Sequence, residues 1–341
     1  MKALGTVRLT RLTAAVAAAA CMLWANLAAA SIPKCSGTDL VPSLRQQQPA
    51  LMERVHARAA KIPNGEAILW KVERSGVPAS YLFGTIHVSD IRVARLSEKV
   101  RAALHSSKTV AVEVKNASTL RLTRLIAANP TRFMSLGGNQ LEQKLSPAEL
   151  AITNDVIKSI GIPQQAARVL KPWFVNLLLS APACERQRAA KGYSVLDRVV
   201  ADEALNRGVT LIGLETIDEQ FNALSSLPEE TQIGILRTSI VFAKQIEDYF
   251  ETLIQLYQRR QINLTLPLSI EIARAAGIDV APLEAFNETL ATKRNYTMRD
   301  RSLPLLRKGG AFVAVGSLHL VGKEGLVALF RKAGYRVTPV E

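Results

Sequence analysis

The sequence predicts an α/β fold: a central, largely parallel sheet flanked by helices, with a helical elaboration in the middle of the chain. Apolar, β-branched runs alternate with amphipathic stretches of helical length, which is the pattern of βαβ units. The interval from about Leu120 to Leu205 is dominated by helical patterns and is expected to elaborate the sheet. With 341 residues, 48% of them hydrophobic, the composition is that of a globular protein with a substantial core.

The first half is expected to open with a polar lead and a helix, followed by strands. After the lead (residues 31–49) and the helix, AILWKVERSGVPASYLFGTIH contains two strands joined by a Ser-Gly-Val-Pro turn. SEKVRAALHSS is helical, and KTVAVEVK is a short β-branched strand that carries Glu113 at its end. Strand, helix and strand at this spacing indicate a parallel arrangement.

Two helices of the middle region carry clear end signals. Ser146 and Pro147, followed by Glu149, mark a helix start, and Gly208 closes the helix of SVLDRVVADEALNRG. Between them KPWFVNLLLSAPAC is also helical. These helices are expected to extend the sheet domain and not to fold as a separate unit.

The rest of the chain returns to strands at intervals. VTLIGLET is a strand ending at Glu215, and residues 227–260 form one or two long helices. EAFNETLATKRNYTMRDRSLPLLRKGG is expected to be one helix closed by two glycines, and AFVAVGSLHL a buried strand that breaks into a loop. KEGLVALFRKAGYRVTPVE then supplies a helix and a final strand.

Residues 1–30 are interpreted as a cleaved signal peptide that precedes one domain, residues 31–341. A basic start leads into an apolar, small-residue segment, and Ala28 and Ala30 occupy the positions that signal peptidase reads, which predicts cleavage before Ser31. The alternatives are an uncleaved anchor and, less well supported, a lipoprotein at Cys21. The expected location is the periplasm or the exterior, and the signal alone engages the export membrane.

Export changes how the cysteines are interpreted. Cys35 and Cys184 remain after cleavage, and two thiols in an oxidising compartment most simply form one disulfide. Neither has a Cys-x-x-Cys partner or a nearby histidine, so a catalytic thiol is not expected.

The formal charge of +14 falls by three, to +11, when the basic residues of the leader, Lys2, Arg8 and Arg11, are removed. The excess is spread along the chain without a basic run or interleaved aromatics, so no nucleic-acid partner is expected. The oligomeric state cannot be read from the sequence.

One arrangement occurs twice. In YLFGTIHVSD and in FVAVGSLHLVG an apolar run meets a glycine, and a histidine follows three positions later: Gly84 with His87, and Gly316 with His319. Because ligands bind at the carboxyl edge of a parallel sheet, both imidazoles are expected to converge there. The glycines are expected to let the backbone turn sharply. The competing interpretation is that each histidine is a hydrogen-bonded loop residue and that so short a motif repeats by chance.

Carboxylates end two further strands of the same kind. Glu113 and Glu215, with His87 and His319, form a donor set suited to a divalent hydrolytic metal such as Mn, Co or Zn. Asp90 is expected to orient the ring of His87.

Other common sites find no support in the sequence. His56 and His105 lie in polar, helix-like stretches and are read as surface residues. No HExxH, no Gly-x-Ser-x-Gly and no phosphate-cradling loop is present, which argues against a helical zinc protease, a serine hydrolase and a P-loop enzyme.

Over nearly the whole mature chain, these stretches resemble the TraB/GumN/TIKI family. The resemblance rests on YLFGTIHVSD, VAVEV, SVLDRVVADEALNRGVTLIGLETIDEQ, KRNYTMRD and GGAFVAVGSLHLVGKEGLVALFRKAGYRV, and the leading CSGTDL is similar to bacterial GumN-type members. It implies a fold related to the erythromycin-esterase and ChaN-like proteins, with the site at the two Gly-x-x-His motifs. Animal TIKI members are metal-dependent proteases that favour manganese or cobalt.

Carried over residue by residue, the resemblance makes His87, His319 and Glu113 the site residues. It adds Arg294 and Asn295 as substrate or transition-state contacts, because arginine suits bidentate binding of a carboxylate. Arg294 also reads as a surface cation of its helix, and Glu215 as an acid at a helix N-terminus. Many bacterial GumN-type proteins have no established reaction, so activity transfers less well than fold.

Three functional hypotheses follow. The first is an exported metal-dependent hydrolase, a peptidase acting on a peptide or protein substrate. The second is a metal-independent hydrolase in which a histidine–glutamate pair activates water. The third is a non-catalytic periplasmic protein that binds a peptide or assists assembly of an envelope polysaccharide.

Overall fold

The structure, a computed structural model, describes residues 32–115, 119–135, 140–163 and 167–341. The chain divides into two units, Met1–Lys34 and Cys35–Glu341, and all the elements below belong to the second. The expected signal peptide, residues 1–30, lies outside the described residues. Within the described part, every helix is too short or too polar to cross a membrane.

A single mixed sheet of six strands confirms the predicted α/β class. Its spatial order is β4-β3-β5-β2-β1-β6. The central pairs β4/β3, β3/β5 and β5/β2 are parallel, whereas β1 runs antiparallel to both β2 and β6. The six strands are β1 Leu69–Glu73, β2 Ser80–Thr85, β3 Thr109–Val114, β4 Thr210–Glu215, β5 Ala311–Gly316 and β6 Arg336–Pro339.

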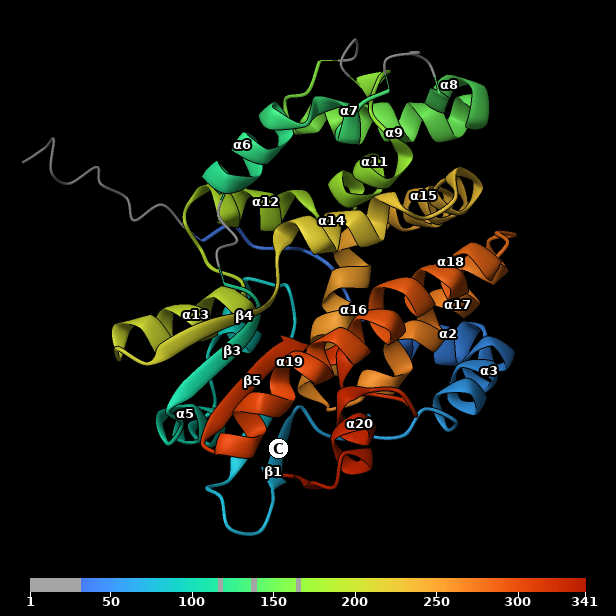
Figure 1. The fold of residues 1–341 in the computed structure, drawn as a ribbon. Helices are drawn as coiled ribbons and strands as arrows, with labels where there is room; N and C mark the ends of the chain where they lie inside the picture. Colours follow the sequence, from blue (N-terminus) through green and yellow to red (C-terminus); the bar gives the residue numbers. More distant parts are fainter. Residues whose placement is uncertain (1–31, 116–118, 136–139, 164–166) are drawn as a thin grey trace, which may run out of the picture. The chain divides into compact units, whose positions relative to one another are not determined.

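Helices form most of the remaining structure and surround the sheet (Figure 1). Those before β4 are α2 Leu40–Gln47, α3 Pro49–Ala59, α4 Ile91–Ala94, α5 Glu98–His105, α6 Thr119–Ala128, α7 Pro130–Phe133, α8 Gln140–Lys144, α9 Pro147–Ser159, α11 Pro172–Leu179, α12 Ala183–Ala190 and α13 Leu196–Asn206. Those after it are α14 Ile217–Ser225, α15 Glu229–Ala243, α16 Ile246–Gln258, α17 Thr265–Ala275, α18 Ala281–Asn287, α19 Arg294–Lys308 and α20 Leu326–Lys332, with short 3₁₀ turns η1 Ile262–Leu264 and η3 Ser317–His319.

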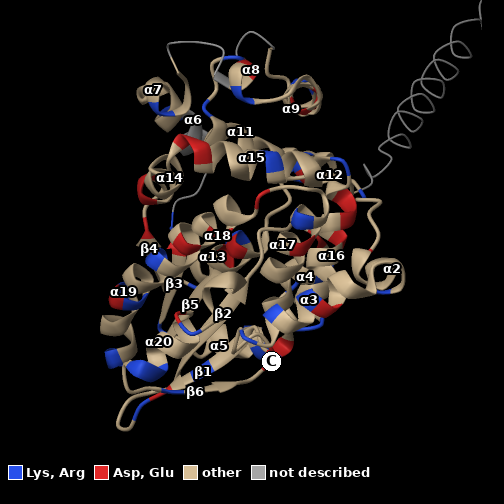
Figure 2. Cartoon of the chain, turned by 90° about the vertical axis from the view of Figure 1, so that its right-hand side faces the viewer, with Lys and Arg blue, Asp and Glu red and all other residues tan. Residues whose placement is uncertain are grey.

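The sheet is buried on both faces, as the uninterrupted apolar strands predict. Neighbouring residues of a strand point to opposite faces. Phe83 and Phe312 therefore pack with α5, α13 and α16 on one side, while Leu82 and Val313 pack with α19 and α20 on the other. Basic and acidic residues are interspersed over the helices (Figure 2).

The predicted helical elaboration has a core of its own within this unit. Helices α7, α8, α9 and α11 pack with α14 and α15 around a common apolar cluster, and α6 to α11 lie together at the top of Figure 1. The ring of Phe133 lies 5.3 Å from that of Trp173 and 5.6 Å from that of Phe221, measured between centroids. The helix start predicted at Ser146 and Pro147 is confirmed by α9, where Ser146 and Glu149 also form a capping box.

Two expectations about helices were wrong. The polar lead contains α2, whose first turn is capped by the Asp39 carboxylate accepting from the Val41 N–H; polar composition concealed an ordinary cap. The long helix expected near the end is also not uniform, because residues Glu288–Lys293 form a π-helix between α18 and α19. A helical hydrophobic pattern does not distinguish these two helix types.

Cys35 and Cys184 form the predicted disulfide, which joins the start of the second unit to α12 across 149 positions of sequence. Closing a loop of that length removes conformational entropy from the unfolded chain and stabilises the fold by ~5 kcal/mol on the chain-entropy account. Nearby, the Ser36 N–H and hydroxyl both bind the Glu247 carboxylate, so the same segment is also held by hydrogen bonds.

Removal of the disulfide is expected to lower the free energy of unfolding by about 2–5 kcal/mol. The measurement is urea unfolding of the wild type and of the double variant Cys35→Ala/Cys184→Ala, each with and without a thiol reductant. Reductant should lower the midpoint of the wild type to that of the double variant and leave the double variant unchanged. Equal midpoints for oxidised wild type and double variant would show that the cross-link contributes nothing.

Candidate active site at the carboxyl edge of the sheet

The carboxyl ends of four parallel strands meet at one edge. In the β2/β5 pair Thr85 lies opposite Gly316, and in the β3/β4 pair Val114 lies opposite Glu215. Because β5 also pairs with β3, all four strands point the same way. The segments that carry both Gly-x-x-His motifs and both carboxylates therefore leave the sheet side by side, as the sequence predicts.

A cavity of about 210 Å3 opens at this edge. Its lining includes four of the six predicted site residues: His87, Glu113, Arg294 and His319. The other two lie behind them, since Asn295 is buried against His319 and Glu215 is buried against Arg294. Apolar residues of α16, η1 and η3 complete the wall.

The two motif glycines are needed for close packing and not for a turn, which corrects the expectation. Gly316 has φ −52°, and Gly84 lies within β2. A Cβ on Gly84 would come within 2.9 Å of Leu320 and 3.1 Å of Ser317, the backbone that carries His319. A Cβ on Gly316 would come within 3.2 Å of the Glu113 Oε1 atom. The absence of a side chain thus lets the η3 turn pack against β2 at Gly84, and lets the Glu113 carboxylate pack against β5 at Gly316.

His319 is buried and held in one tautomer. Its Nδ1 lies 2.7 Å from Asn295 Oδ1, and the Asn295 amide nitrogen donates to the Glu324 carbonyl. Because that carbonyl only accepts, the network assigns the Asn295 oxygen as acceptor and the His319 Nδ1 as donor. Burial lowers the pKa of His319 to about 4, against the opposing effect of Glu113. At neutral pH the ring is uncharged, and its Nε2 keeps a lone pair.

Glu113 faces that lone pair as a carboxylate. Its Oε1 accepts from the Gly316 N–H at 2.6 Å and lies 3.7 Å from His319 Nε2. Its Oε2 accepts from Arg294 and from Gln220. Burial alone would raise the pKa of Glu113, but the nearby histidines, Arg294 and the Gly316 N–H lower it to about 2. Two acceptors thus face each other, an arrangement that suits a cation between them.

His87 has the opposite character. Its side chain is 69% exposed, and its Nδ1 lies 2.7 Å from Asp197 Oδ2. The Thr85 hydroxyl donates to the other oxygen of the same carboxylate. The charge of Asp197 raises the pKa of His87 to about 9, so the ring is protonated at neutral pH.

Asp90 does not take the role expected of it. Its carboxylate caps α4 by accepting from the Arg92 N–H, and it pairs with the side chains of Arg92 and Arg188. The residue that orients His87 is Asp197, more than a hundred positions away. Proximity in sequence was the wrong guide here, because the edge is assembled from distant segments.

Arg294 joins the two carboxylates. Its Nη2 donates to Glu113 at 2.8 Å and to Glu215 at 2.6 Å, and its Nε lies 3.0 Å from both Glu215 oxygens. Its Nη1 donates to the carbonyl of Leu290 in the π-helix. Arg294 follows directly on that π-helix, a local geometry that is frequent at functional sites. Glu215 thus binds the guanidinium on both oxygens and stands behind the cavity.

Three site residues were missed from sequence: Asp197, Gln220 and Thr85. Asp197 and Gln220 lie in the first turns of α13 and α14, where an acid or amide is ordinary, so neither stands out. Thr85 is the last residue of β2, two positions before His87. Its place at a strand end, beside a motif histidine, was the available signal.

The donor chemistry suits a divalent metal, but the described side chains do not preassemble one. Both motif histidines place Nδ1 against an oxygen, which leaves Nε2 for a metal, the usual arrangement of ligating histidines. His319 Nε2 and Glu113 Oε1 form a close pair of donors. Among the described residues, however, no group of three or more His, Cys, Asp or Glu side chains is gathered closely enough to hold an ion.

The fold and the site together define an α/β protein whose carboxyl-edge cavity carries two histidines of contrasting charge beside an arginine-bound glutamate. More particularly, the chain belongs to the TraB/PrgY/gumN family, whose profile matches residues 68–339. The matched range contains the six predicted site residues.

Similar proteins include animal metalloproteases. Metalloprotease TIKI2 of Danio rerio is 25% identical over 319 residues, which cover 80% of this chain and 60% of that protein. A metalloprotease TIKI homolog of Nematostella vectensis is 25% identical over 327 residues, covering 82% and 68%. An uncharacterized protein of Treponema pallidum is 22% identical over 289 residues, covering 80% and 82%. The chain thus spans about 60% of the length of the TIKI2 protein. No solved structure matches the chain with comparable significance.

The Arg294→Met variant is expected to lose about 3–5 kcal/mol of unfolding free energy, because it leaves two buried carboxylates without their cation. The measurement is urea unfolding at pH 7. Arg299→Met is the matched control: Arg299 lies on the same helix and pairs with the exposed Asp300, a kind of pair worth about 1 kcal/mol or less. Similar losses in the two variants would contradict a structural role for the Arg294 fork.

Stability should fall as pH is lowered from about 6.5 toward 4, in part through His319. The unfolded ring takes up a proton near its ordinary pKa of 6.5, whereas the folded ring resists until about pH 4. The unfolded state therefore binds more protons in this window, and stability rises with pH across it. Glu113, whose folded pKa of about 2 lies below the ordinary 4.5, adds a further loss below pH 4.5.

The check is urea unfolding of wild type and His319→Gln at pH 7 and pH 5. Between pH 7 and pH 5 the wild type should lose about 2 kcal/mol more unfolding free energy than the variant. This is the linkage free energy of one proton that only the unfolded state binds between pH 6.5 and pH 5. His56→Gln, which removes an exposed histidine of α3, should behave as wild type. Parallel losses in wild type and His319→Gln would show that His319 does not contribute.

Proposed function

We propose that the chain is an exported, metal-dependent hydrolase that cleaves peptide bonds. One observation carries the proposal: two histidines, each with Nδ1 held by an oxygen, line one cavity with an ionised glutamate at the carboxyl edge of the sheet. The similarity to TIKI metalloproteases supports the peptide-bond chemistry and a metal. The metal we propose is a divalent ion, Mn, Co or Zn.

His319 Nε2, Glu113 Oε1 and His87 Nε2 are the donors proposed for the metal. A bound divalent metal would polarise the scissile carbonyl and lower the pKa of the attacking water toward neutrality. Since His87 is protonated at neutral pH, it must release its Nε2 proton to become a donor, so binding is expected to strengthen with rising pH.

The remaining residues of the site hold these groups. Asp197 and Asn295 fix the ring orientations of His87 and His319. Arg294, anchored by Glu215, keeps Glu113 ionised and in place. We therefore propose Glu215 as the anchor of Arg294 instead of a metal ligand, because both its oxygens already accept from the guanidinium.

A metal-independent hydrolase is the second candidate, and the His87–Asp197 pair favours it. A protonated imidazole backed by a carboxylate is a proton donor for a leaving amine. The neutral His319 Nε2 and the ionised Glu113 opposite are acceptors for a proton of the attacking water. The raised pKa of His87 suits it to act as the acid, and the lowered pKa of His319 suits it to act as the base.

Export is proposed from residues 1–30, with the periplasm or exterior as the location and a peptide or protein as substrate. The disulfide between Cys35 and Cys184 supports an oxidising compartment. The third candidate, a non-catalytic binding protein, shares this location and predicts that alanine at both motif histidines changes no function.

The deciding experiment measures metal and cleavage on the same protein. Purified chain is dialysed with Mn2+, Co2+ or Zn2+, analysed for bound metal, and incubated with a peptide pool read by mass spectrometry. Near one bound ion per chain is expected in wild type. His319→Ala should lose the metal and at least a hundredfold in cleavage rate, whereas His56→Ala, at an exposed position of α3, should retain both.

The outcomes separate the three candidates. Cleavage that survives chelation and a metal content near zero would replace the metal enzyme by the His87–Asp197 acid–base hydrolase. Absence of cleavage with every metal, together with full complementation of a deletion by the variant His87→Ala/His319→Ala, would leave the binding protein.

A further inference from the structure

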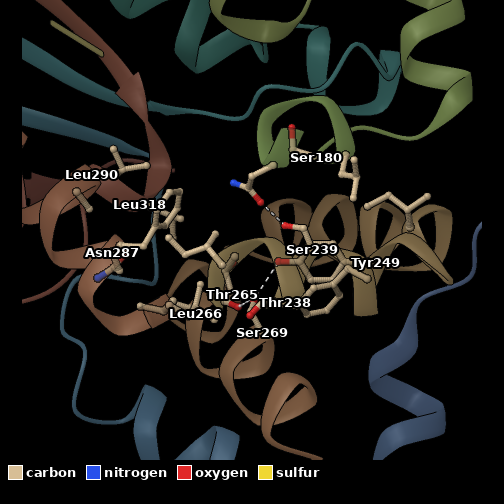
Figure 3. Close-up of a pocket in the computed structure, with 18 of the residues that line it drawn as sticks. Ser180, Thr238, Ser239, Tyr249, Thr265, Leu266, Ser269, Asn287, Leu290 and Leu318 are labelled. Atoms are coloured by element: carbon tan, nitrogen blue, oxygen red, sulfur yellow. Dashed lines mark hydrogen bonds between the residues drawn. The ribbon is translucent and has the colours of Figure 1, made fainter. Parts of the chain in front are cut away.

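A second and larger cavity adjoins the first. It measures about 350 Å3, against about 210 Å3 for the cavity of the site. Four residues line both: Thr265, Arg294, Leu318 and His319. The two cavities therefore share a stretch of wall that includes His319, which places the larger cavity directly beside the site. Figure 3 shows this larger cavity, with Leu318 and Leu290 on one side and Tyr249 on the other.

Most side chains that line the larger cavity are aliphatic or aromatic, contributed by helices α11 and α15–α18 and by the π-helix. Examples are Leu179, Ile235, Phe242, Leu283 and Phe286. Its volume is within the range of small-molecule and peptide side-chain pockets, which start near roughly 300 Å3. An apolar wall of this size gains free energy when it is covered by apolar groups.

Four hydroxyls of the wall, those of Thr238, Ser239, Tyr249 and Ser269, already take part in hydrogen bonds within the protein. Tyr249 Oη lies 2.7 Å from Ser269 Oγ, whose hydroxyl donates to the Thr265 carbonyl. Ser239 donates to Asn176 Oδ1 at 2.5 Å, and Thr238 donates to Gly234 of its own helix. Figure 3 draws the Tyr249–Ser269 and Ser239–Asn176 hydrogen bonds as dashed lines. A charged or strongly polar group entering here would lose its water and meet donors that are already used.

Leu318 marks where a chain would pass between the cavities. It lies in the η3 turn between Gly316 and His319, directly before the histidine, and is 37% exposed although large and apolar. Leu318 lines both cavities and a third of about 180 Å3 beside Asn295 and Glu324. An exposed leucine at the meeting point of three hollows is suited to contact an extended peptide.

We infer that the larger cavity is a specificity pocket that receives a large apolar side chain, such as leucine or phenylalanine, from the substrate residue that flanks the cleaved peptide bond. The inference rests on the proposed function, because it places the scissile bond beside His319. The shared wall supplies the link: what enters the larger cavity is held next to the imidazole.

The first test is a cleavage profile. The probes are blocked hexapeptides, acetyl-Gly-Gly-Xaa-Xaa-Gly-Gly-amide, with each Xaa drawn from Leu, Phe, Ser, Asp and Lys, incubated with the metal-loaded full chain and read by mass spectrometry. One of the two Xaa positions should require Leu or Phe, with kcat/KM at least tenfold above Ser and higher still above Asp and Lys. A profile without preference at either position would overturn the inference.

Two substitutions tie the preference to this cavity. Thr238 is buried in the wall of the cavity, and its hydroxyl binds only a carbonyl of its own helix. The ring introduced by Thr238→Phe should therefore fill the pocket and reduce the preference for Leu to below threefold. Thr238→Val keeps the shape and should retain it. Leu283→Glu, at a half-buried position of α18, should shift the preference toward Lys by at least tenfold. Unchanged profiles in both Thr238→Phe and Leu283→Glu would place the selectivity elsewhere.

If no hexapeptide is cleaved, the proposed function is contradicted, and the specificity pocket is then tested by peptide binding. Calorimetric titration of the same peptides then measures binding directly. Leu- or Phe-containing peptides should bind at least tenfold more tightly than the Ser-Ser peptide to wild type and Thr238→Val, and lose this difference in Thr238→Phe. Equal binding of all peptides would reject the pocket, whatever the outcome for catalysis.

Discussion

The site depends on one buried charge, the carboxylate of Glu113. It lies between two valines, one residue before the end of β3, and is held ionised by the nearby histidines, by Arg294 and by the N–H of Gly316. A carboxylate in such a place is costly unless it meets a cation and donors. Glu215 completes the arrangement by anchoring the same guanidinium. Without the Arg294 fork, the two buried carboxylates would lose the cation that they share.

Much of this architecture was predictable from sequence because it rests on local patterns. The β-branched runs specify buried parallel strands, and strands that run parallel place their carboxyl ends together. Glu113, His87 and His319 were therefore found from their positions relative to strand ends. The disulfide was predicted because two cysteines remain when residues 1–30 are interpreted as a cleaved signal peptide.

The parts that were missed depend on contacts between distant segments. Asp197 binds His87 from the first turn of α13. Acidic residues are common in the first turn of a helix, so the sequence gives no sign of a role in the site. Asp90 is close in sequence but is bound by Arg92 and Arg188. The glycines were interpreted as turn residues, whereas the neighbouring strands and the η3 turn need the space that a Cβ would occupy. The π-helix before Arg294 likewise leaves no trace in hydrophobic spacing.

The repeated motif does not imply repeated roles. Both histidines follow an apolar strand and a glycine, and both have Nδ1 held by an oxygen. One oxygen belongs to the carboxylate of Asp197, whose charge raises the pKa of His87 to about 9. The other belongs to a neutral amide in a buried setting, so the pKa of His319 falls to about 4. Because the backbone motif places the rings and their distant partners set their charge, the two halves of the site are complementary although their sequences are alike.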